Sequence, residues 1–223
     1  MDLKTKTALI NYLSTHITDN KRQKMDEIVK QRTRHVSVLL EDIFQHHNAS
    51  AITRSVECFG VQDLHIVQDK FKFQVTAGVA MGSTKWISMY NYQTIEKAYA
   101  SLKDQGYRIV ATTPHATASN LEDLPLDRKL VLVFGTENVG LSPWAMEHAD
   151  EYMAIPMVGF TESFNVSVSA AISLYQITSK LRKSNIEWQL SEDEQADVYL
   201  SWLKRAIRGS QEYERLFLES YQK

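Results

Sequence analysis

Two stretches of this chain place a short apolar run directly before a polar, glycine-containing loop. Residues 130–134 read LVLVF and precede GTENVGL, and residues 151–156 read EYMAIP and precede a second polar loop that contains Gly159. A helix start follows each loop, at Ser142–Pro143 in the first stretch and at Thr161 or Ser163 in the second. Short apolar runs bounded in this way are typical of buried strands. These strand–loop–helix units constrain the fold more than any other feature.

The same alternation runs through the central sequence. Further strands are predicted at 36–40, 63–67, 86–90 and 107–113, with helices at 49–60, 94–106 and 163–183. This order predicts an α/β fold, a parallel sheet flanked by helices. Because ligands of open parallel sheets bind beyond the carboxyl ends of the strands, the two loops predict a small-molecule site. No GxGxxG or Walker A sequence follows a strand, so a dinucleotide or P-loop site is not supported.

The ends of the chain differ from this central part. Residues 1–35 read as two polar helical segments, and two more helices are predicted near 194–207 and 211–218. We therefore predict a central domain at 36–183 with short helical extensions at 1–35 and 184–223. A chain of 223 residues with 43% hydrophobic residues can bury a sizeable core. No apolar run reaches the roughly 20 residues that cross a bilayer, so no membrane partner is expected.

Charge and cysteine content limit the possible partners. The net charge of −2 argues mildly against nucleic acid, because affinity for phosphates rests on Lys and Arg. Residues 21–35 are nevertheless locally basic, and this basic stripe fits RNA binding as well as it fits a solvated helix face. Its basic residues are Lys21, Arg22, Lys24, Lys30, Arg32 and Arg34. The single cysteine, Cys58, excludes an internal disulfide and a cysteine-cluster metal site, and we expect it to be a buried packing residue.

A third motif, HHNASAITRSVECFG, occupies residues 46–60. If Asn48 caps the helix that follows, Arg54 lies about one and a half turns into it. Phosphate and carboxylate are the natural partners of such an arginine, although a solvated or salt-bridged Arg54 fits the pattern as well. His46 and His47 lie beside Asn48, but neighbours in sequence rarely bind one metal ion together. We therefore predict no metal site.

The two loops that follow residues 130–134 and 151–156 carry polar groups where a ligand would lie. Gly135 and Gly140 let the backbone approach a ligand closely, and Glu137 between them is an acceptor. Ser163 and Asn165 offer a hydroxyl and an amide at the start of the next helix. A plain βα turn and a capped helix with a small-residue face are the structural alternatives.

The three motifs, in this order, resemble those of the SpoU family of SPOUT methyltransferases, which methylate a ribose 2′-hydroxyl of RNA. The resemblance covers residues 36–183. It implies S-adenosyl-L-methionine as the cofactor, a deep trefoil knot near the carboxyl end of the core, and a homodimer with active sites shared between subunits. Within the family, the short extensions favour the branch that methylates guanosine 18 in the D-loop of tRNA. A ribosomal RNA 2′-O-methyltransferase, a non-catalytic knotted RNA-binding relative and an unrelated nucleotide-binding protein are the alternatives.

The resemblance also implies roles for particular residues. Arg54 would come from the other subunit and, because arginine resists deprotonation, would bind the ribose-phosphate and assist proton removal without being the base itself. The implied catalytic residues are Asn48, Arg54, Glu137, Ser163 and Asn165. The implied cofactor-binding residues are Thr112, Gly135, Ile155, Met157 and Phe164. The RNA-binding candidates are Lys21, Arg22, Lys24, Arg32 and Arg34, and a cytoplasmic location is expected.

Overall fold

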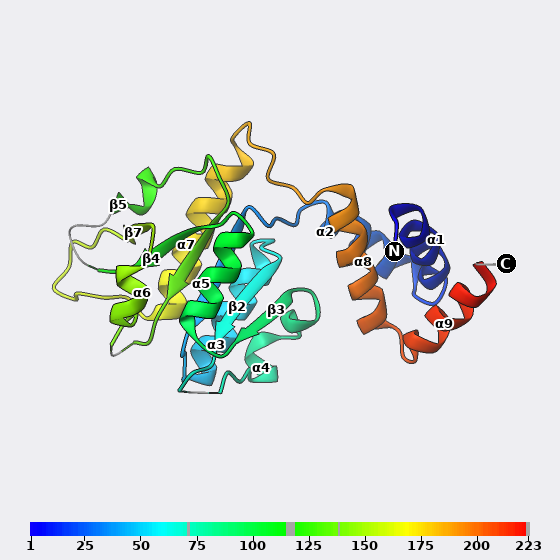
Figure 1. Cartoon of the computed structure of the whole chain (residues 1–223), viewed down its shortest axis with the longest axis horizontal. Coiled ribbons are helices and arrows are strands. Elements are labelled where there is room, and N and C mark those ends of the chain that lie inside the picture. The colour runs from blue at the N-terminus through cyan, green and yellow to red at the C-terminus, as the bar shows by residue number, and fades with distance from the viewer. Residues whose placement is uncertain (71, 115–118, 138, 222–223) are drawn as a thin grey trace. The chain divides into compact units, whose positions relative to one another are not determined.

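The computed structural model describes residues 1–70, 72–114, 119–137 and 139–221, and its central part is a parallel sheet flanked by helices (Figure 1). Within these residues the strands pair in the order β3-β2-β1-β6-β4-β7-β5, and every pair is parallel. The strands are β1 (Val36–Glu41), β2 (Asp63–Val67), β3 (Ser88–Tyr92), β4 (Arg108–Thr112), β5 (Ser119–Asn120), β6 (Leu130–Phe134) and β7 (Glu151–Ala154). The predicted α/β fold class is confirmed.

Helices cover both faces of the sheet, so the central strands bury side chains in both directions. On one face Val38 and Leu40 of β1 share a core with α3 and α7, and on the other face Leu39 shares a core with α5. The helices of this part are α3 (His46–Cys58), α4 (Ala77–Ala80), α5 (Ile95–Asp104), α6 (Pro143–Glu147) and α7 (Val166–Arg182), with 3₁₀ turns at Ser83–Lys85 and Leu121–Asp123.

All the strands run in one direction, so their carboxyl ends lie at one edge of the sheet. β1 lies between β2 and β6, and β4 lies between β6 and β7. The segments that leave β1, β6 and β7 at this edge carry the three sequence motifs. Strand pairing therefore brings together motifs that are far apart in the chain. Pairing does not define whether the chain passes through a loop, so the trefoil knot stays a prediction.

Several predicted boundaries are wrong. Helix α3 begins at His46 with Gln45 as its N-cap, so Asn48 lies inside the first turn and does not cap the helix. Helix α7 begins at Val166, and β3 runs two residues later than predicted. Short elements, among them β5 and the 3₁₀ turn at Leu121–Asp123, were not predicted at all. Elements this short leave no periodic pattern in a sequence.

Cys58 is exposed, so its predicted burial is also wrong. Ile52 and Val56 point to the core from α3, whereas Arg54 and Cys58 lie four residues apart on the opposite, solvent-facing side. Residues four apart on a helix share a face. The exposure of Cys58 follows from that of Arg54.

The chain divides into two compact units, residues 33–188 and residues 1–32 together with 189–223. In the second, helical unit α1 (Leu3–Ser14) packs against α8 (Glu192–Ala206) and α9 (Ser210–Tyr221), and α2 (Asp19–Val29) packs against α8. Leu9 and Leu13 of α1 and Trp202 of α8 are among its buried residues. Both ends of the chain thus belong to one helical body. The limits of the domains predicted above stay a prediction.

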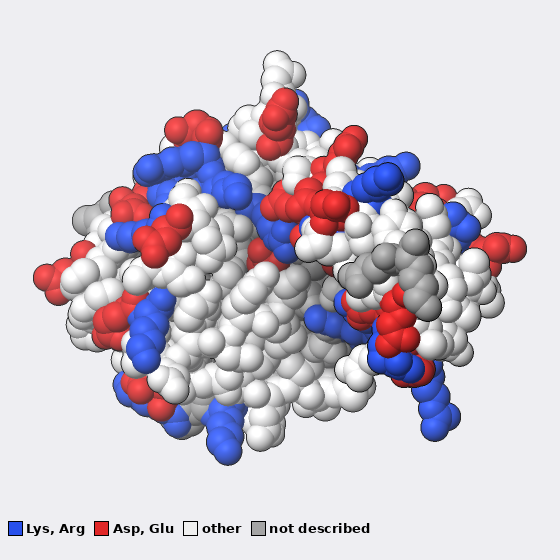
Figure 2. Space-filling model, turned by 45° about the vertical axis from the view of Figure 1, so that its right-hand side comes forward, with Lys and Arg blue, Asp and Glu red and all other residues white. Residues whose placement is uncertain are grey.

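The described residues contain no helix that is long and apolar enough to span a membrane. Within the same residues, no group of three or more His, Cys, Asp or Glu side chains is arranged to hold a metal ion. Figure 2 shows one face of the molecule, on which Lys and Arg side chains lie among Asp and Glu side chains. This mixture agrees with the small net charge of the whole sequence.

Candidate active site

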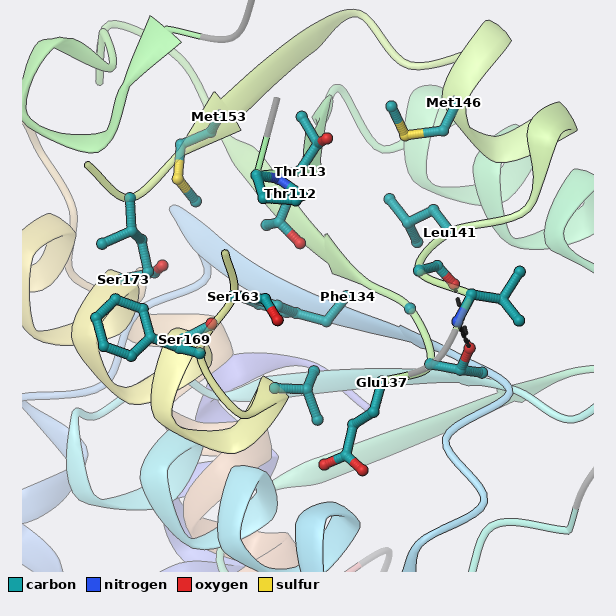
Figure 3. Close-up of a pocket in the computed structure, with 18 of the residues that line it drawn as sticks. Thr112, Thr113, Phe134, Glu137, Leu141, Met146, Met153, Ser163, Ser169 and Ser173 are labelled. Atoms are coloured by element: carbon teal, nitrogen blue, oxygen red, sulfur yellow. Dashed lines mark hydrogen bonds between the residues drawn. The ribbon is translucent and has the colours of Figure 1, made fainter. Parts of the chain in front are cut away.

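A cavity of about 350 Å³ opens at the carboxyl edge of β4, β6 and β7 (Figure 3). This volume lies within the roughly 300–1,000 Å³ of small-molecule sites. The cavity is lined by every residue predicted to bind the cofactor: Thr112, Gly135, Ile155, Met157 and Phe164. Two of the predicted catalytic residues, Glu137 and Ser163, also line it. The structure thus gathers these residues at one site, and their individual roles stay predictions.

The lining combines apolar walls with hydroxyl groups. Phe134, Leu141, Met146 and Met153 supply apolar surface, and the hydroxyls come from Thr112, Ser163, Ser169 and Ser173, among others (Figure 3). Ser169 and Ser173 lie four residues apart on α7, where the sequence suggested only a small-residue packing face. Their hydroxyls are thus functional candidates that the sequence analysis missed, and their spacing was the signal that could have found them.

Ser173 has a buried hydroxyl that the protein does not satisfy. The residue is fully buried, and its Oγ has no hydrogen-bond partner among the described residues. The hydroxyl of Thr112, by contrast, donates to the Val133 carbonyl oxygen at 2.8 Å. A buried polar group without a partner costs about 1–3 kcal/mol. A polar ligand in the cavity would offset that cost.

The loop at 135–141 is closed by its own backbone. The amide of Thr136 donates to the carbonyl oxygen of Gly140 at 3.0 Å, and the amide of Gly140 donates back at 2.9 Å. A Cβ atom on Gly135 would lie 2.2 Å from that same carbonyl oxygen, so no other residue fits there. Gly140 has a φ of +74°, in the left-handed region that favours glycine. Both glycines are therefore required by the loop.

Buried Glu41 fixes the exit of this loop. Glu41 ends β1, and its Oε2 accepts a hydrogen bond from the amide of Ser142 at 2.8 Å. Ser142 in turn caps α6, since its side chain accepts from the amide of Ala145. The carboxyl end of β1, the strand next to β6, thus holds the end of the 135–141 loop in place.

Glu137 joins the three motifs. Its Oε1 accepts hydrogen bonds from Nδ2 of Asn48 and, at 2.8 Å, from Nδ2 of Asn165. The same Nδ2 of Asn165 also lies 3.1 Å from Oδ1 of Asn48. Asn48 is only 2% exposed, whereas Glu137 and Asn165 are exposed. The sequence placed these residues at one site, but it did not predict that they bond to one another.

Asn165 also caps α7. Its Oδ1 accepts from the amides of Ser167 at 2.8 Å and Val168 at 3.4 Å, which leaves its Nδ2 free to face Glu137. The sequence placed the start of this helix at Thr161 or Ser163, whereas Asn165 is its N-cap. One side chain therefore both starts the helix and reaches the cavity edge.

Arg54 is not part of this cluster within one chain. It lies on the exposed side of α3 and is not among the described residues that line the cavity. Within the described part of the chain it makes no hydrogen bond or ion pair. The structure therefore brings Asn48, Glu137, Ser163 and Asn165 to one edge and leaves Arg54 facing outward.

Only some residues of the predicted RNA-binding stripe are exposed to solvent. Arg22 and Lys24 are exposed on α2 and Lys21 is half-buried. Arg32 is 1% exposed and its guanidinium lies 5.9 Å from the ring centroid of Trp202, so it faces the protein, and its contact with RNA stays a prediction. The chain leaves α2 before Arg32 and turns it into the helical core. Arg34, in the other unit, forms an ion pair with buried Asp63 at 2.9 Å.

Comparison with known proteins identifies the family. The model of the SpoU rRNA Methylase family matches residues 35–175. A Borreliella burgdorferi protein named tRNA (guanosine(18)-2′-O)-methyltransferase is 39% identical over 207 residues, which cover 93% of this chain and 95% of that protein. An Escherichia coli protein of the same name is 33% identical over 67% of this chain and 66% of its own length. The chain belongs to the SpoU methylase family.

Solved structures agree with this assignment. The crystal structure of an A. aeolicus TrmH/SpoU tRNA modifying enzyme aligns with a TM-score of 0.77 and 29% identity, over 85% of this chain and 98% of that one. The SpoU methyltransferase AviRb from Streptomyces viridochromogenes, solved with its cofactor AdoMet, aligns with a TM-score of 0.58 and 17% identity, over 71% of this chain and 62% of that one. The second likeness concerns the fold alone.

Proposed function

We propose that this protein transfers the methyl group of S-adenosyl-L-methionine to the 2′-hydroxyl of guanosine 18 in the D-loop of tRNA. The observation that carries the proposal is the meeting of the three motifs at one cavity, where Asn48 and Asn165 both donate to Glu137. The relative from Borreliella burgdorferi, which bears the name of this activity, matches nearly the whole length of both chains. That match extends beyond the central domain into the terminal helices and so supports the tRNA substrate.

The cavity suits S-adenosyl-L-methionine in size and chemistry. Apolar side chains such as Met146 and Met153 would pack against the cofactor, and the closed 135–141 loop would present backbone groups to it. The unmatched hydroxyl of Ser173 fits a polar ligand. When bound, the cofactor supplies a methyl group on a positively charged sulfonium.

The protein must hold the ribose hydroxyl in line with that methyl group and help to remove its proton. Fixed geometry of this kind supplies a large part of the rate enhancement of two-substrate reactions. Glu137, held by Asn48 and Asn165, would order the cofactor loop, and Ser163 would position the hydroxyl or Arg54. Arg54 would bind the ribose-phosphate of the substrate, because a guanidinium presents several N–H donors to phosphate oxygens.

We propose that Arg54 acts in the active site of a second subunit. Its exposed position on α3, away from the cavity of its own chain, supports this arrangement. Val158 and Phe160, in the loop of the third motif, have fully exposed side chains, and Val139 in the second motif is 81% exposed. Exposed large apolar side chains of this kind favour a protein interface. A homodimer through this loop would cover them and bring Arg54 to a neighbouring cavity.

The rest of the proposal concerns RNA binding, topology and location. Lys21, Arg22 and Lys24 on α2 would contact the phosphates of tRNA. The segment after β7 would pass through the trefoil knot that the family resemblance implies. The single cysteine fits a reducing compartment, and we propose a cytoplasmic location.

The test is to incubate the purified protein with labelled S-adenosyl-L-methionine and unmodified tRNA transcripts, and to map the product by mass spectrometry. We expect 2′-O-methylguanosine at position 18, and no product with Arg54→Ala at unchanged cofactor affinity. Methylation of ribosomal RNA in place of tRNA would keep the chemistry and change the substrate. Binding of tRNA without any transfer would favour a non-catalytic RNA-binding protein.

Mixing inactive variants tests the shared site. Arg54→Ala and Glu137→Ala each remove a group from a different part of the proposed site. If each site combines Arg54 of one subunit with Glu137 of the other, co-refolded mixed dimers regain activity, because one of their two sites is intact. Mixtures that stay inactive, although mass spectrometry detects mixed dimers, would place both residues in the same chain's site.

A further inference from the structure

Two side chains outside the cavity hydrogen-bond to the amides that reach Glu137. Gln45 is the N-cap of α3 but makes no side-chain bond to the helix amides; its Oε1 instead accepts from Nδ2 of Asn48 at 2.8 Å. The hydroxyl of Ser167, in the first turn of α7, donates to Oδ1 of Asn165 at 2.6 Å. Neither Gln45 nor Ser167 is among the described residues that line the cavity.

These contacts set which end of each amide faces Glu137. A primary amide has one accepting and one donating end, and only the donating end can bond a carboxylate. Asn48 uses its two amide hydrogens on Gln45 and Glu137, and its oxygen accepts from Asn165. The hydrogen-bonding capacity of this nearly buried amide is therefore well used. Rotating it by 180° would turn its oxygen toward two other oxygens.

Asn165 is held in the same sense. Its oxygen faces the amide and the hydroxyl of Ser167, so its nitrogen must face Glu137 and Asn48. The bonds thus run in one direction from Ser167 through Asn165 and Asn48 to Gln45, and Glu137 accepts from both amides. These bonds tie α3, the 135–141 loop and α7 together at the mouth of the cavity.

We propose that Gln45 and Ser167 are positioning residues for methyl transfer: by orienting the amides of Asn48 and Asn165, they fix Glu137 and hold α3 at the cofactor loop. This inference rests on the proposed function. Because Gln45 is exposed, its bond contributes little to the stability of the fold, and its effect falls on the geometry of the site. Helix α3 carries both Asn48 and Arg54, so loosening Asn48 also loosens the placement of Arg54.

The main test compares two replacements of Gln45. Gln45→Met keeps the length of the side chain and removes the acceptor, whereas Gln45→Glu keeps an oxygen acceptor. We expect Gln45→Met to lower kcat about tenfold, with KM for the cofactor within about twofold and the melting temperature within about 2 °C. Gln45→Glu should recover most of the lost kcat. Ser167→Ala should give a smaller loss, and Ser167→Thr, which keeps the hydroxyl, should restore it.

Gln105→Met is the matched control. Gln105 is also exposed and also bonds to its own helix region, through Ser101, but it lies beyond the end of α5 just before β4, at the opposite edge of the sheet. Its replacement should leave kcat unchanged. Unchanged kcat in Gln45→Met would overturn the inference. The inference would also be overturned if Gln45→Glu lost as much kcat as Gln45→Met and both losses followed a lower melting temperature, because Gln45 would then have only a structural role.

A measurement independent of activity separates this inference from the proposed function. The side-chain amide protons of Asn48, assigned in the ¹⁵N spectrum with Asn48→Asp, should exchange with water faster in Gln45→Met than in the wild-type protein. Unchanged exchange would show that Gln45 does not hold Asn48. If the wild-type protein methylates no RNA, the proposed function falls, and amide exchange alone decides whether Gln45 orients Asn48.

Discussion

The active-site edge of the central unit and the surface of α2 use polar side chains in opposite ways. At the edge, Asn48 and Asn165 are separated by 117 positions in the chain and meet on Glu137. On α2, Lys21, Arg22 and Lys24 come from one stretch of helix and face solvent to different degrees. In a hydrogen-bonded cluster, the loss of one donor or acceptor alters the positions of the other members. Exposed charges are screened by salt, and their contributions to RNA binding add up. Substitutions should therefore alter turnover or cofactor affinity at the edge and only RNA affinity on α2.

The largest effect is expected from Gly135→Ala. The added Cβ would overlap the carbonyl oxygen of Gly140 at 2.2 Å, which forces the cofactor loop open. Overpacking costs about 1–3 kcal/mol, and a loss of this size in cofactor binding would weaken affinity up to about a hundredfold. Calorimetric titration with S-adenosyl-L-methionine measures it. Gly78→Ala on α4 is the control, because none of the described residues has an atom within 4 Å of its added Cβ. Equal affinity of both variants would contradict the role of the loop.

A smaller and more selective effect is expected from Asn165→Asp. The new carboxylate still accepts from the amides of Ser167 and Val168, and its charge suits a helix N-terminus, so α7 stays capped. It no longer donates to Glu137 and instead places a like charge beside it. We expect kcat to fall about ten- to a hundredfold with an unchanged or higher melting temperature. Asn165→Ala loses both functions and should lower both quantities. A fall in the melting temperature of Asn165→Asp as large as that of Asn165→Ala would mean that the capping bond is lost too.

The free energy of unfolding of the central unit should depend on pH through His65, which lies outside the candidate active site. This residue of β2 is stacked on Tyr90 at 5.0 Å, and burial lowers its pKa from 6.5 to about 4. Between these two values the unfolded chain binds a proton that the folded chain does not, so stability falls as the pH is lowered. The full free energy of unfolding is present above about pH 6.5, and protonation of His65 in the unfolded chain lowers it by about 2 kcal/mol by pH 5.

Urea unfolding at pH 7.5 and pH 5, followed by a probe in the central unit, measures this loss. His65→Phe removes the titrating group and should make the central unit less sensitive to acid by that amount. His47→Phe, at an exposed position on α3, is the control and should keep the acid sensitivity of the wild-type protein. Equal acid sensitivity of all three proteins would assign the effect to other groups.

The sequence predicted the sheet and the site residues because both leave local signals. Buried strands such as 130–134 are continuous apolar runs. The loop that follows begins at Gly135, which has no room for a Cβ, and contains Gly140, whose positive φ favours glycine. The cap of α7 was placed too early because Thr161, Ser163 and Asn165 are all good capping residues. Their competition is decided by tertiary contacts, since the amide of Asn165 bonds Glu137 from another segment.

Side-chain partners distant in the chain could not be predicted. Nothing near Gln45 indicates that its oxygen bonds Asn48, and nothing near Arg32 indicates that Trp202 lies beside it. Arg32 was grouped with the stripe because it follows other basic residues, yet its position after the end of α2 turns it into the core. Charge patterns report which residues are close in sequence, whereas burial depends on the packing of α2 against α8.

The last prediction therefore separates the surface part of the stripe from Arg32. Replacing Lys21, Arg22 and Lys24 with Ala should weaken tRNA binding and leave cofactor affinity unchanged. The slope of log affinity against log salt should become shallower by about 0.7–0.9 for each phosphate that the protein no longer neutralises. Filter binding of tRNA at several salt concentrations measures both effects. Arg128→Ala, an exposed position at the opposite edge of the sheet from the active site, is the control and should keep the slope.

Arg32→Ala should behave differently from the triple variant. Its loss removes a buried guanidinium that lies over Trp202, so it should lower the stability of the helical unit by about 1–3 kcal/mol and change the salt slope little. A triple variant with the wild-type salt slope would show that tRNA does not bind this part of α2. An Arg32→Ala variant that is stable but binds tRNA with a reduced slope would place this arginine at the RNA after all. The salt slopes of the two variants thus decide whether the exposed residues Lys21, Arg22 and Lys24 bind the phosphates of tRNA together, and whether Arg32 serves only to stabilise the helical unit.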